Sequence, residues 1–213
     1  MVGGGVLREC LEDPQVESIL AVGRQSCGVT HPKLGELLLS DLFNLDDMKG
    51  DLNGYEACFY CIGLSSVGMS ESDYRRVTLD LTIAVASGLV EVNPGLTFCY
   101  VSAQGSDSSG RGRFMWARIR GETENCLLQM PFPAYIFRPG FIRPLKGVPS
   151  RTKAVRLLYT ILGPFFPILN RLFPNQVTTT VRIGQAMIRT ATIGCSNQVL
   201  ETRDINALAM VAV

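Results

Sequence analysis

The stretch LTFCYVSAQGSDSSGRGRFMWARIRGETENCLLQMPFPAYIFR, residues 96–138, decides the fold. Its first part, Leu96–Ser102, and its last part, Ala134–Arg138, are short apolar runs of the kind that form strands. Between them lie a Gly/Ser/Asp loop over 104–113 and a helical stretch over 114–130. A strand, a helix and a second strand in this order predict a βαβ unit with parallel strands.

The same alternation of short apolar strands and helical stretches runs through the rest of the chain. Strands are predicted over Ser18–Gly23, Glu36–Ser40 and Tyr55–Gly63, and helices over Gly4–Asp13 and Ser70–Val92. The strands lack a clean polar alternation, which is typical of a sheet covered on both faces. We therefore predict an α/β fold, a doubly wound parallel sheet of the Rossmann type with helices on both faces.

A single domain is expected over residues 1–213, since a chain of this length holds one well-formed core. The segment Pro139–Ser150, rich in proline and glycine, is the best candidate seam. It would separate a nucleotide-binding core, 1–140, from a small, mostly helical substrate-side cap, 141–213, which also holds a short apolar run at Gln198–Leu200.

Charge and composition narrow the classes of partner and compartment. A net charge of +1 gives no electrostatic reason to expect nucleic acid as a partner. Seven cysteines, an odd number outside any small disulfide-rich frame, predict reduced thiols in an intracellular protein. No basic and then apolar segment follows Met1, so a cytoplasmic protein is expected.

The first residues, MVGGGVLREC, look like the end of a glycine-rich turn followed by a helix, with no strand before them. In dinucleotide-binding folds the first strand runs into such a turn, and the next helix points its N-terminus at the pyrophosphate. Gly3 would then be the last glycine of that turn. The first strand is therefore predicted to be missing; a disordered glycine-rich leader is the alternative.

Six motifs relate the chain to a known family: MVGGGVLRECL from Met1, AVGRQS (21–26), CIGLSS (61–66), YVSAQGSDSSGRGRFMWARIRGETEN (100–125), FRPGFIRP (137–144) and LFPNQVTTT (172–180). With them the chain resembles the atypical short-chain dehydrogenases/reductases, in the NAD(P)H-binding branch of the Tat-interacting-protein-like oxidoreductases and NmrA-like proteins. The resemblance covers nearly the whole chain. Members commonly read TGATGMVGGGVLRECL near their start, which implies that the strand and most of the TGATG loop are absent here.

The resemblance implies a set of cofactor-binding residues. Arg24, just after the second strand of the family fold, would meet the adenosine ribose; an acid there favours NAD, whereas the planar fork of an arginine suits the 2′-phosphate of NADP. NADP is therefore the expected cofactor, ahead of NAD. The remaining positions are Gly3 at the pyrophosphate, Asp41 and Leu42 beside the adenine, Ile62 and Gly63 at the ribose, and Pro139 and Gly140 at the nicotinamide.

Reductases of this type use a serine and a YxxxK pair, whose tyrosine exchanges a proton with the substrate oxygen and whose lysine lowers the pKa of that phenol. Here Ser102 holds the serine position, Trp116 the tyrosine position and Arg120 the lysine position. An indole N–H donates a hydrogen bond but is not a practical acid, whereas Arg120 could still bind ribose hydroxyls. Tyr100, on the same strand face as Ser102, is the alternative proton donor.

These residues predict an NADP(H)-binding oxidoreductase or epimerase-like protein that acts on an unidentified small molecule. Two alternatives stay open: a non-catalytic regulator that senses NADP(H) and binds a protein partner or a second copy of the chain, and a non-functional truncated product. The missing strand would leave Ser18–Gly23 and Tyr55–Gly63 without a common neighbour. Weak NADP(H) binding and poor folding are expected in that case.

Other reactive residues are predicted to be structural. Cys58 and Cys61 form a CxxC, but residues three apart on a strand face opposite ways and are expected to pack in the core. His31 is the only histidine, and no metal site is predicted. Asp46 and Asp47 are predicted to cap a short helix.

The most apolar stretch is AVRLLYTILGPFFPILNRLF, Ala154–Phe173, whose length approaches a membrane span. Pro164 and Pro167 interrupt it and disfavour a spanning helix. Core packing, a lid over the substrate pocket, and a dimer or membrane-surface patch stay open as interpretations. Peripheral membrane association is therefore the alternative to a purely cytoplasmic location.

Overall fold

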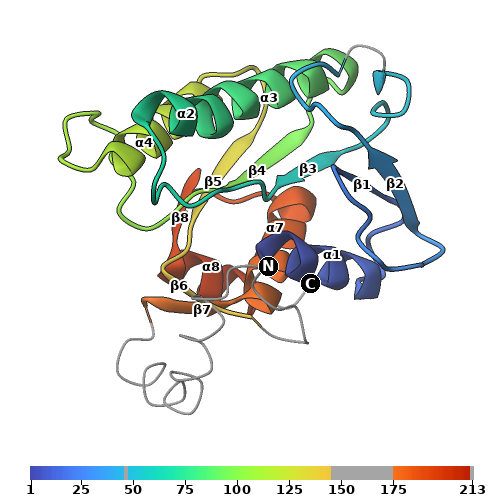
Figure 1. Cartoon of the computed structure of the whole chain (residues 1–213). Helices are drawn as coiled ribbons and strands as arrows, with labels where there is room; N and C mark the ends of the chain where they lie inside the picture. Colours follow the sequence, from blue (N-terminus) through green and yellow to red (C-terminus); the bar gives the residue numbers. More distant parts are fainter. Residues whose placement is uncertain (46–47, 145–174, 212–213) are drawn as a thin grey trace.

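The computed structural model describes residues 1–45, 48–144 and 175–211 (Figure 1). Asp46, Asp47 and the apolar stretch 154–173 lie outside the described residues, as does half of the seam predicted at 139–150. Among the helices of the described ranges, none is long and apolar enough to cross a membrane.

The centre of the fold is a four-stranded parallel sheet, as the sequence predicts. Its strands lie in the order β3-β4-β5-β8, with bounds β3 Ala57–Tyr60, β4 Thr97–Val101, β5 Ala134–Arg138 and β8 Val199–Glu201. Helix α4, Met115–Leu128, connects β4 to β5, and Phe98 lies in register with Ala134. The βαβ unit predicted over residues 96–138 is confirmed.

Two further strand pairs lie outside this sheet (Figure 1). Strands β1, Ile19–Gly23, and β2, Leu34–Leu38, form a parallel pair of their own. Strands β6, Phe141–Arg143, and β7, Val177–Thr179, form another, which the sequence did not predict because each has only three residues. No ladder joins β1 to β3.

Helices cover both faces of the four-stranded sheet, so the predicted doubly wound arrangement is confirmed (Figure 1). One face carries α4 together with α2, Glu71–Arg75, a π-helical turn, Arg76–Asp80, and α3, Leu81–Val92. The other face carries α1, Val2–Glu12, α7, Thr180–Ile193, and α8, Thr202–Leu208.

The predicted helix over Ser70–Val92 is one continuous helical run with a π-helical turn inside it. Ser70 is its N-cap, and the Ser70 hydroxyl oxygen accepts a hydrogen bond from the amide of Asp73 at 3.1 Å. Such a cap satisfies one of the amides that a helix start leaves without an acceptor. The sequence therefore predicts where this helix begins but not its internal change of pitch.

Each face of the sheet has its own apolar core. On the α3 face, Phe98, Tyr100 and Ile136 from the strands pack against Leu89 of α3 and Leu127 of α4. On the α7 face, Cys99 and Phe137 from the strands pack against Val6 of α1 and against Ile183 and Met187 of α7. Alternate residues of one strand therefore supply both cores, which is why the strands contain so few polar residues.

The two cysteines of the CxxC pack in different cores, as strand geometry predicts. Cys58 packs against the cluster on the α3 face, whereas Cys61 packs against the cluster on the α7 face. All seven cysteines are free thiols. Burial raises the pKa of the Cys58 and Cys61 thiols to about 12, so both stay protonated at neutral pH.

Helices α1 and α7 interlock through glycines. A Cβ atom at Gly5 of α1 would overlap the Cβ of Thr180 and lie 2.9 Å from its Oγ1. From the other side, a Cβ at Gly184 of α7 would lie 2.9 Å from the Cβ of Glu9. The two backbones approach as closely as they do because neither glycine has a side chain.

This close approach predicts opposite effects for the same substitution in two helices. We expect Gly5→Ala to destabilise the protein by about 1–3 kcal/mol, because the new methyl group must displace the buried Thr180. Gly88→Ala in α3 is the matched control, since its methyl would make only ordinary contacts with Leu45, and it should stabilise by up to about 1 kcal/mol. Urea unfolding of both variants measures the two effects; a Gly5→Ala variant as stable as the parent would contradict the interlock.

Candidate active site

The candidate site lies where β3, β4 and β5 end. Parallel sheets of this kind bind ligands at the carboxyl ends of their strands, because the connecting loops and helix N-termini gather there. Gly63 follows β3, Ser102 follows β4, and Pro139 with Gly140 follows β5. Since the three strands are neighbours in the sheet, these segments come together at one edge.

Gly3 lies where helix α1 meets the end of β3. A Cβ atom at Gly3 would stand 3.3 Å from the Cβ of Cys61, so a larger residue would push the helix away from the strand. The first hydrogen bond inside the helix runs from the Gly5 amide to the Met1 carbonyl, at 3.2 Å. The amides of the first turn therefore have no acceptor within the helix, which suits them to an anion.

Arg120 reaches the same edge from helix α4. Its Nη2 lies 3.7 Å from where a Cβ of Gly63 would be. Its Nε donates a hydrogen bond of 3.0 Å to the hydroxyl of Tyr74, a residue that is 1% exposed. Tyr74 therefore anchors the guanidinium from below and is itself too deeply buried to touch a bound molecule.

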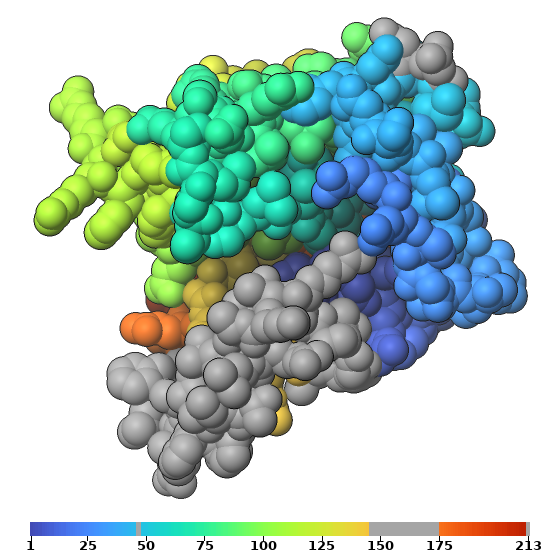
Figure 2. Space-filling view, viewed as in Figure 1, coloured from blue at the N-terminus to red at the C-terminus, as the bar shows by residue number. Residues whose placement is uncertain are grey.

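Trp116 lies one helical turn before Arg120, on the same face of α4. Its Cη2 lies 3.5 Å from where a Cβ of Gly105 would be, and its ring stacks against Phe114 with centroids 6.5 Å apart. Phe114 itself is largely exposed, so this ring pair presents an apolar surface to solvent. Figure 2 shows the loop before α4, in yellow-green, projecting beside the teal residues that follow β3.

Ser102 is held inside a buried hydrogen-bond network. Its hydroxyl donates to the carboxylate of Glu124, and its oxygen lies 3.0 Å from the Ser106 hydroxyl. Ser102 is 5% exposed and Glu124 is 1% exposed. The hydroxyl that the sequence assigns to catalysis is therefore occupied by Glu124, and it meets a substrate only when that hydrogen bond breaks.

Glu124 and Arg138 are the residues that sequence reasoning missed. Arg138 Nε lies 3.2 Å and 3.1 Å from the two carboxylate oxygens of Glu124, and its Nη2 also bonds that carboxylate. Arg138 Nη1 reaches Glu201 at 3.3 Å. The hydrogen bond with Glu124 raises the pKa of Arg138 further above its ordinary value. The only sequence signal was a charged residue, Glu124, on the face of α4 that also carries Arg120.

Gly140 is enclosed by three polar groups. Its amide donates to Thr202 Oγ1 at 2.8 Å, and a Cβ there would overlap Gln104 Oε1 and lie 2.5 Å from the Gln176 carbonyl oxygen. Next to it, the Pro139 carbonyl accepts a hydrogen bond of 3.1 Å from the Gln104 amide. The turn after β5 therefore accepts only glycine at position 140 and leans against the turn after β4.

Arg24, Asp41 and Leu42 lie on the separate β1–β2 pair. Arg24 follows β1 and is exposed, and the Asp41 carboxylate accepts a hydrogen bond of 2.9 Å from the Phe43 amide. Leu42 packs against the core on the α3 face. Among the described residues, the structure thus brings together Gly3, Ile62, Gly63 and Arg120, and places this second group on another strand pair.

Tyr100 cannot take over proton transfer, so that sequence-based alternative is wrong. Tyr100 does lie on the same strand face as Ser102, but it is 1% exposed and its ring packs at a tilt against the ring of Tyr60 in the core. Burial raises the pKa of the Tyr100 phenol well above its ordinary value. A donor in this position would have neither access to a substrate nor a useful acidity.

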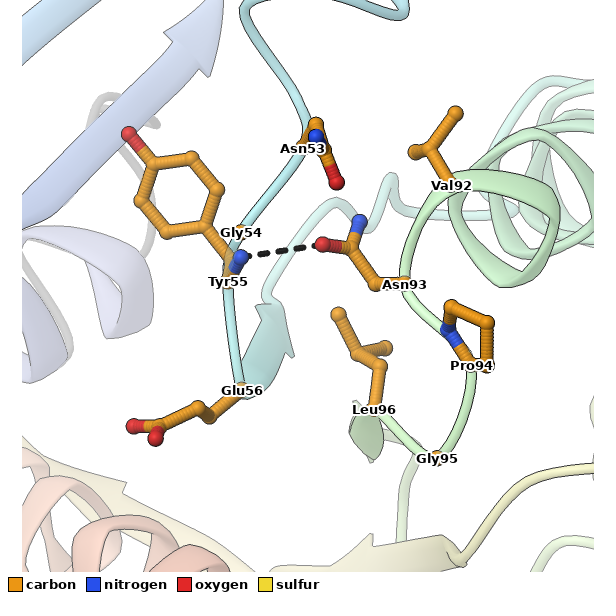
Figure 3. A pocket seen from close by; sticks show the side chains of 9 residues that line it. All are labelled: Asn53, Gly54, Tyr55, Glu56, Val92, Asn93, Pro94, Gly95 and Leu96. Atoms are coloured by element: carbon orange, nitrogen blue, oxygen red, sulfur yellow. Dashed lines mark hydrogen bonds between the residues drawn. The ribbon is translucent and has the colours of Figure 1, made fainter.

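A hollow of about 350 Å³ lies at the opposite end of the strands, between the starts of β3 and β4 (Figure 3). The Asn93 side chain spans it, accepting from the Tyr55 amide at 2.9 Å and donating to the Leu52 carbonyl at 2.8 Å. Every polar end of this amide is thus used to join loops. Within the described part of the chain, no group of three or more His, Cys, Asp or Glu residues could hold a metal ion.

No protein-family model and no curated protein sequence matches the chain. Solved structures do. A dTDP-glucose 4,6-dehydratase from Streptomyces venezuelae, determined with NAD bound, superposes with a TM-score of 0.68 at 12% identity, over 98% of this chain and 77% of that one. A short-chain dehydrogenase family protein from Francisella tularensis gives a TM-score of 0.58 at 13% identity, over 91% of this chain and 87% of that one. The chain has the short-chain dehydrogenase fold.

A UDP-glucose 4-epimerase from Thermotoga maritima also has this fold, with a TM-score of 0.65 at 10% identity, over 98% of this chain and 78% of that one. At these identities the likeness establishes the fold alone. The short-chain dehydrogenase fold agrees with the position of the candidate site, because ligands of such sheets bind at the carboxyl ends of the strands.

The network around Glu124 predicts a sharp contrast between two glutamates of α4. Glu124→Ala should cost about 3–5 kcal/mol of stability, because it leaves the largely buried Arg138 without its main partner. Glu122→Ala, two residues away, removes an ion pair with Arg75 that is exposed on both sides and should cost less than about 1 kcal/mol. Denaturant unfolding measures the loss of stability in both variants. Equal losses would mean that the buried pair does not position α4.

Proposed function

We propose that the chain binds a nicotinamide dinucleotide across the ends of β3, β4 and β5, as an oxidoreductase or epimerase-like protein acting on a small molecule. One observation carries the proposal: Gly3, Gly63 and Arg120, from three separate elements, meet at this edge of the sheet. Each has a chemical role there, since the first turn of α1 offers free amides, Gly63 permits close approach and Arg120 supplies a cation.

The residues present fit such a cofactor in part. The amides of α1 would bind pyrophosphate oxygens, and Arg120, held by Tyr74, would donate to ribose hydroxyls. The enclosed turn at Gly140 would border the nicotinamide ring, which when bound would exchange a hydride with the substrate. Among the described residues, the first turn of α1 would supply the amide donors for the pyrophosphate.

The same residues argue against efficient carbonyl reduction. Trp116 occupies the position of the proton-donating tyrosine, and an indole N–H is not an acid at neutral pH. Ser102 already donates to Glu124. The exposed ring of Phe114, stacked against Trp116, suits the binding of an apolar or ring-shaped substrate, so this surface favours binding over proton transfer.

A non-catalytic role is the second candidate function. In it the chain senses NADP(H) and passes that signal to a protein partner. This candidate is favoured because Arg120 supplies a cation that could bind the cofactor. Trp116, in contrast, could not supply the proton that turnover needs.

The choice between NADP(H) and NAD(H) is predicted from Arg24. In a version of the chain preceded by an apolar strand and a TGATG loop, NADPH should bind about tenfold or more tightly than NADH, because Arg24 can pair with the 2′-phosphate. Arg24→Ala should remove that preference and leave NADH affinity unchanged, whereas Arg111→Ala, an exposed arginine of another loop, should change neither. Calorimetric titration measures the affinities of all three proteins for NADPH and NADH. Tighter binding of NADH than of NADPH by the parent would refute the assignment.

The chemistry is predicted from Trp116. With saturating cofactor, we expect little reduction of aldehydes, ketones or quinones by the parent, and an increase of about 10²-fold in Trp116→Tyr, because that variant regains a phenol near Arg120. Phe114→Tyr is the control, since it adds a phenol to an exposed ring outside helix α4 and should not raise turnover. Robust turnover by the parent that Trp116→Tyr does not improve would show that protons move through another group.

A further inference from the structure

The loop between β4 and α4 is held in one place against the helix. The Asp107 carboxylate accepts hydrogen bonds from the Ser109 amide at 3.0 Å and from the Ser109 hydroxyl at 2.6 Å, which closes the turn from inside. Asn125 of α4 donates from its side-chain amide to the Ser108 carbonyl at 2.8 Å. A Cβ atom at Gly121 would overlap the Asp107 carbonyl, so the loop lies directly on the helix backbone. The residues that end this loop therefore have a defined position at the start of α4.

The charges in and beside this loop do not balance. Arg118 of α4 pairs with the carboxylate of Glu71, at 3.0 Å and 2.8 Å, so these two charges neutralise each other. Asp107 is the only acid of the loop, and its carboxylate accepts from donors of the loop itself. Arg111 and Arg113 are both exposed, and neither forms an ion pair with another described residue. The surface at the start of α4 therefore carries excess positive charge, which favours an anionic ligand.

An aromatic pair follows Arg113 directly in the chain. Phe114 is largely exposed, and its ring stacks on that of Trp116 with 27° between the two planes. Trp116 is only partly buried and packs against the cluster that contains Tyr74, the residue that supports Arg120. The pair is thus fixed to the core through Trp116 and open to solvent at Phe114. A flat ring can stack on such a pair while a neighbouring guanidinium binds an anionic group of the same molecule.

We propose that Arg113, Phe114 and Trp116 bind the substrate, and that this substrate is a planar aromatic molecule carrying a carboxylate or phosphate group. The inference rests on the proposed function, because it names the substrate class of the same site: the bound ring would lie one helical turn from Arg120 and the cofactor ribose. The ring would stack on the aromatic pair, and the planar fork of Arg113 would bind two oxygens of the anion. A neutral ring, or an anion without an aromatic ring, would make only one of these contacts.

Trp116 is the only tryptophan of the chain, so its fluorescence reports on this surface directly. The probes are 4-nitrobenzoate and 4-nitrophenyl phosphate, because a nitroaromatic ring quenches indole fluorescence on contact; 4-nitrobenzyl alcohol is the neutral control. In nucleotide-free titrations of the parent chain, the better of the two anions should bind about fivefold or more tightly than the alcohol, and it identifies the anionic group. Added salt should reduce this difference, because Arg113 is exposed. Calorimetry should show cyclohexanecarboxylate binding about fivefold more weakly than 4-nitrobenzoate, because it cannot stack.

Two substitutions separate the two contacts. Arg113→Gln should weaken binding of the anions about fivefold and leave the affinity for the alcohol unchanged, because it removes the charge but not the ring. Arg203→Gln is the matched control, since it removes an exposed arginine of α8, on the other face of the sheet, and should change neither affinity. Phe114→Leu should weaken binding of all three nitroaromatic probes, because it removes the stacked ring.

Any of three results overturns the inference: no probe quenches Trp116, the alcohol binds as tightly as both anions, or Arg113→Gln and Arg203→Gln weaken anion binding equally. The comparison of probes in the parent chain decides even if a variant fails to fold. No titration here contains a nucleotide. Probe binding without NADPH binding would therefore count against the proposed cofactor site alone, and NADPH binding without probe binding would count against this substrate class alone.

Discussion

The buried pair of Glu124 and Arg138 fixes how helix α4 lies on the sheet, and the candidate site depends on that placement. Arg138 belongs to β5 and also reaches Glu201 of β8, while Glu124 accepts from Ser102 at the end of β4. A single carboxylate therefore joins one helix to two strand ends. Because α4 also carries Trp116 and Arg120, the position of both site residues follows from this buried ion pair.

Strand alternation is the second constraint, and it explains which parts of the fold could be predicted from the sequence. The apolar runs around Phe98 and Ile136 have to cover two faces, so their composition predicts a central parallel sheet correctly. Strands β6 and β7 have three residues each and take their hydrogen bonds from a partner more than thirty residues away. Nothing local distinguishes such segments from loop, which is why they were missed.

The candidate site divides in the same way. The motifs predict that Gly3, Gly63 and Arg120 share one edge of the sheet, where the structure has them; their roles there stay predictions. The hydrogen-bond partner of Ser102 could not be predicted, since Glu124 lies 22 residues away in sequence and on another element. Tyr100 shows the limit of an argument from strand faces: it shares a face with Ser102, yet its ring packs in the core beside Tyr60, whereas the Ser102 hydroxyl bonds to Glu124.

Arg120 and Trp116 stand where the resemblance expects a lysine and a tyrosine, and the surrounding contacts show how each is supported. Arg120 does not need a phenolate partner, because Tyr74 accepts its Nε–H from inside the core. Trp116 does not need a hydrogen-bonding partner to hold its place either, since Gly105 and Phe114 receive its ring. Each residue is thus supported by neighbours of its own. Substituting one position therefore changes the chemistry at that position without removing the contacts that support the other.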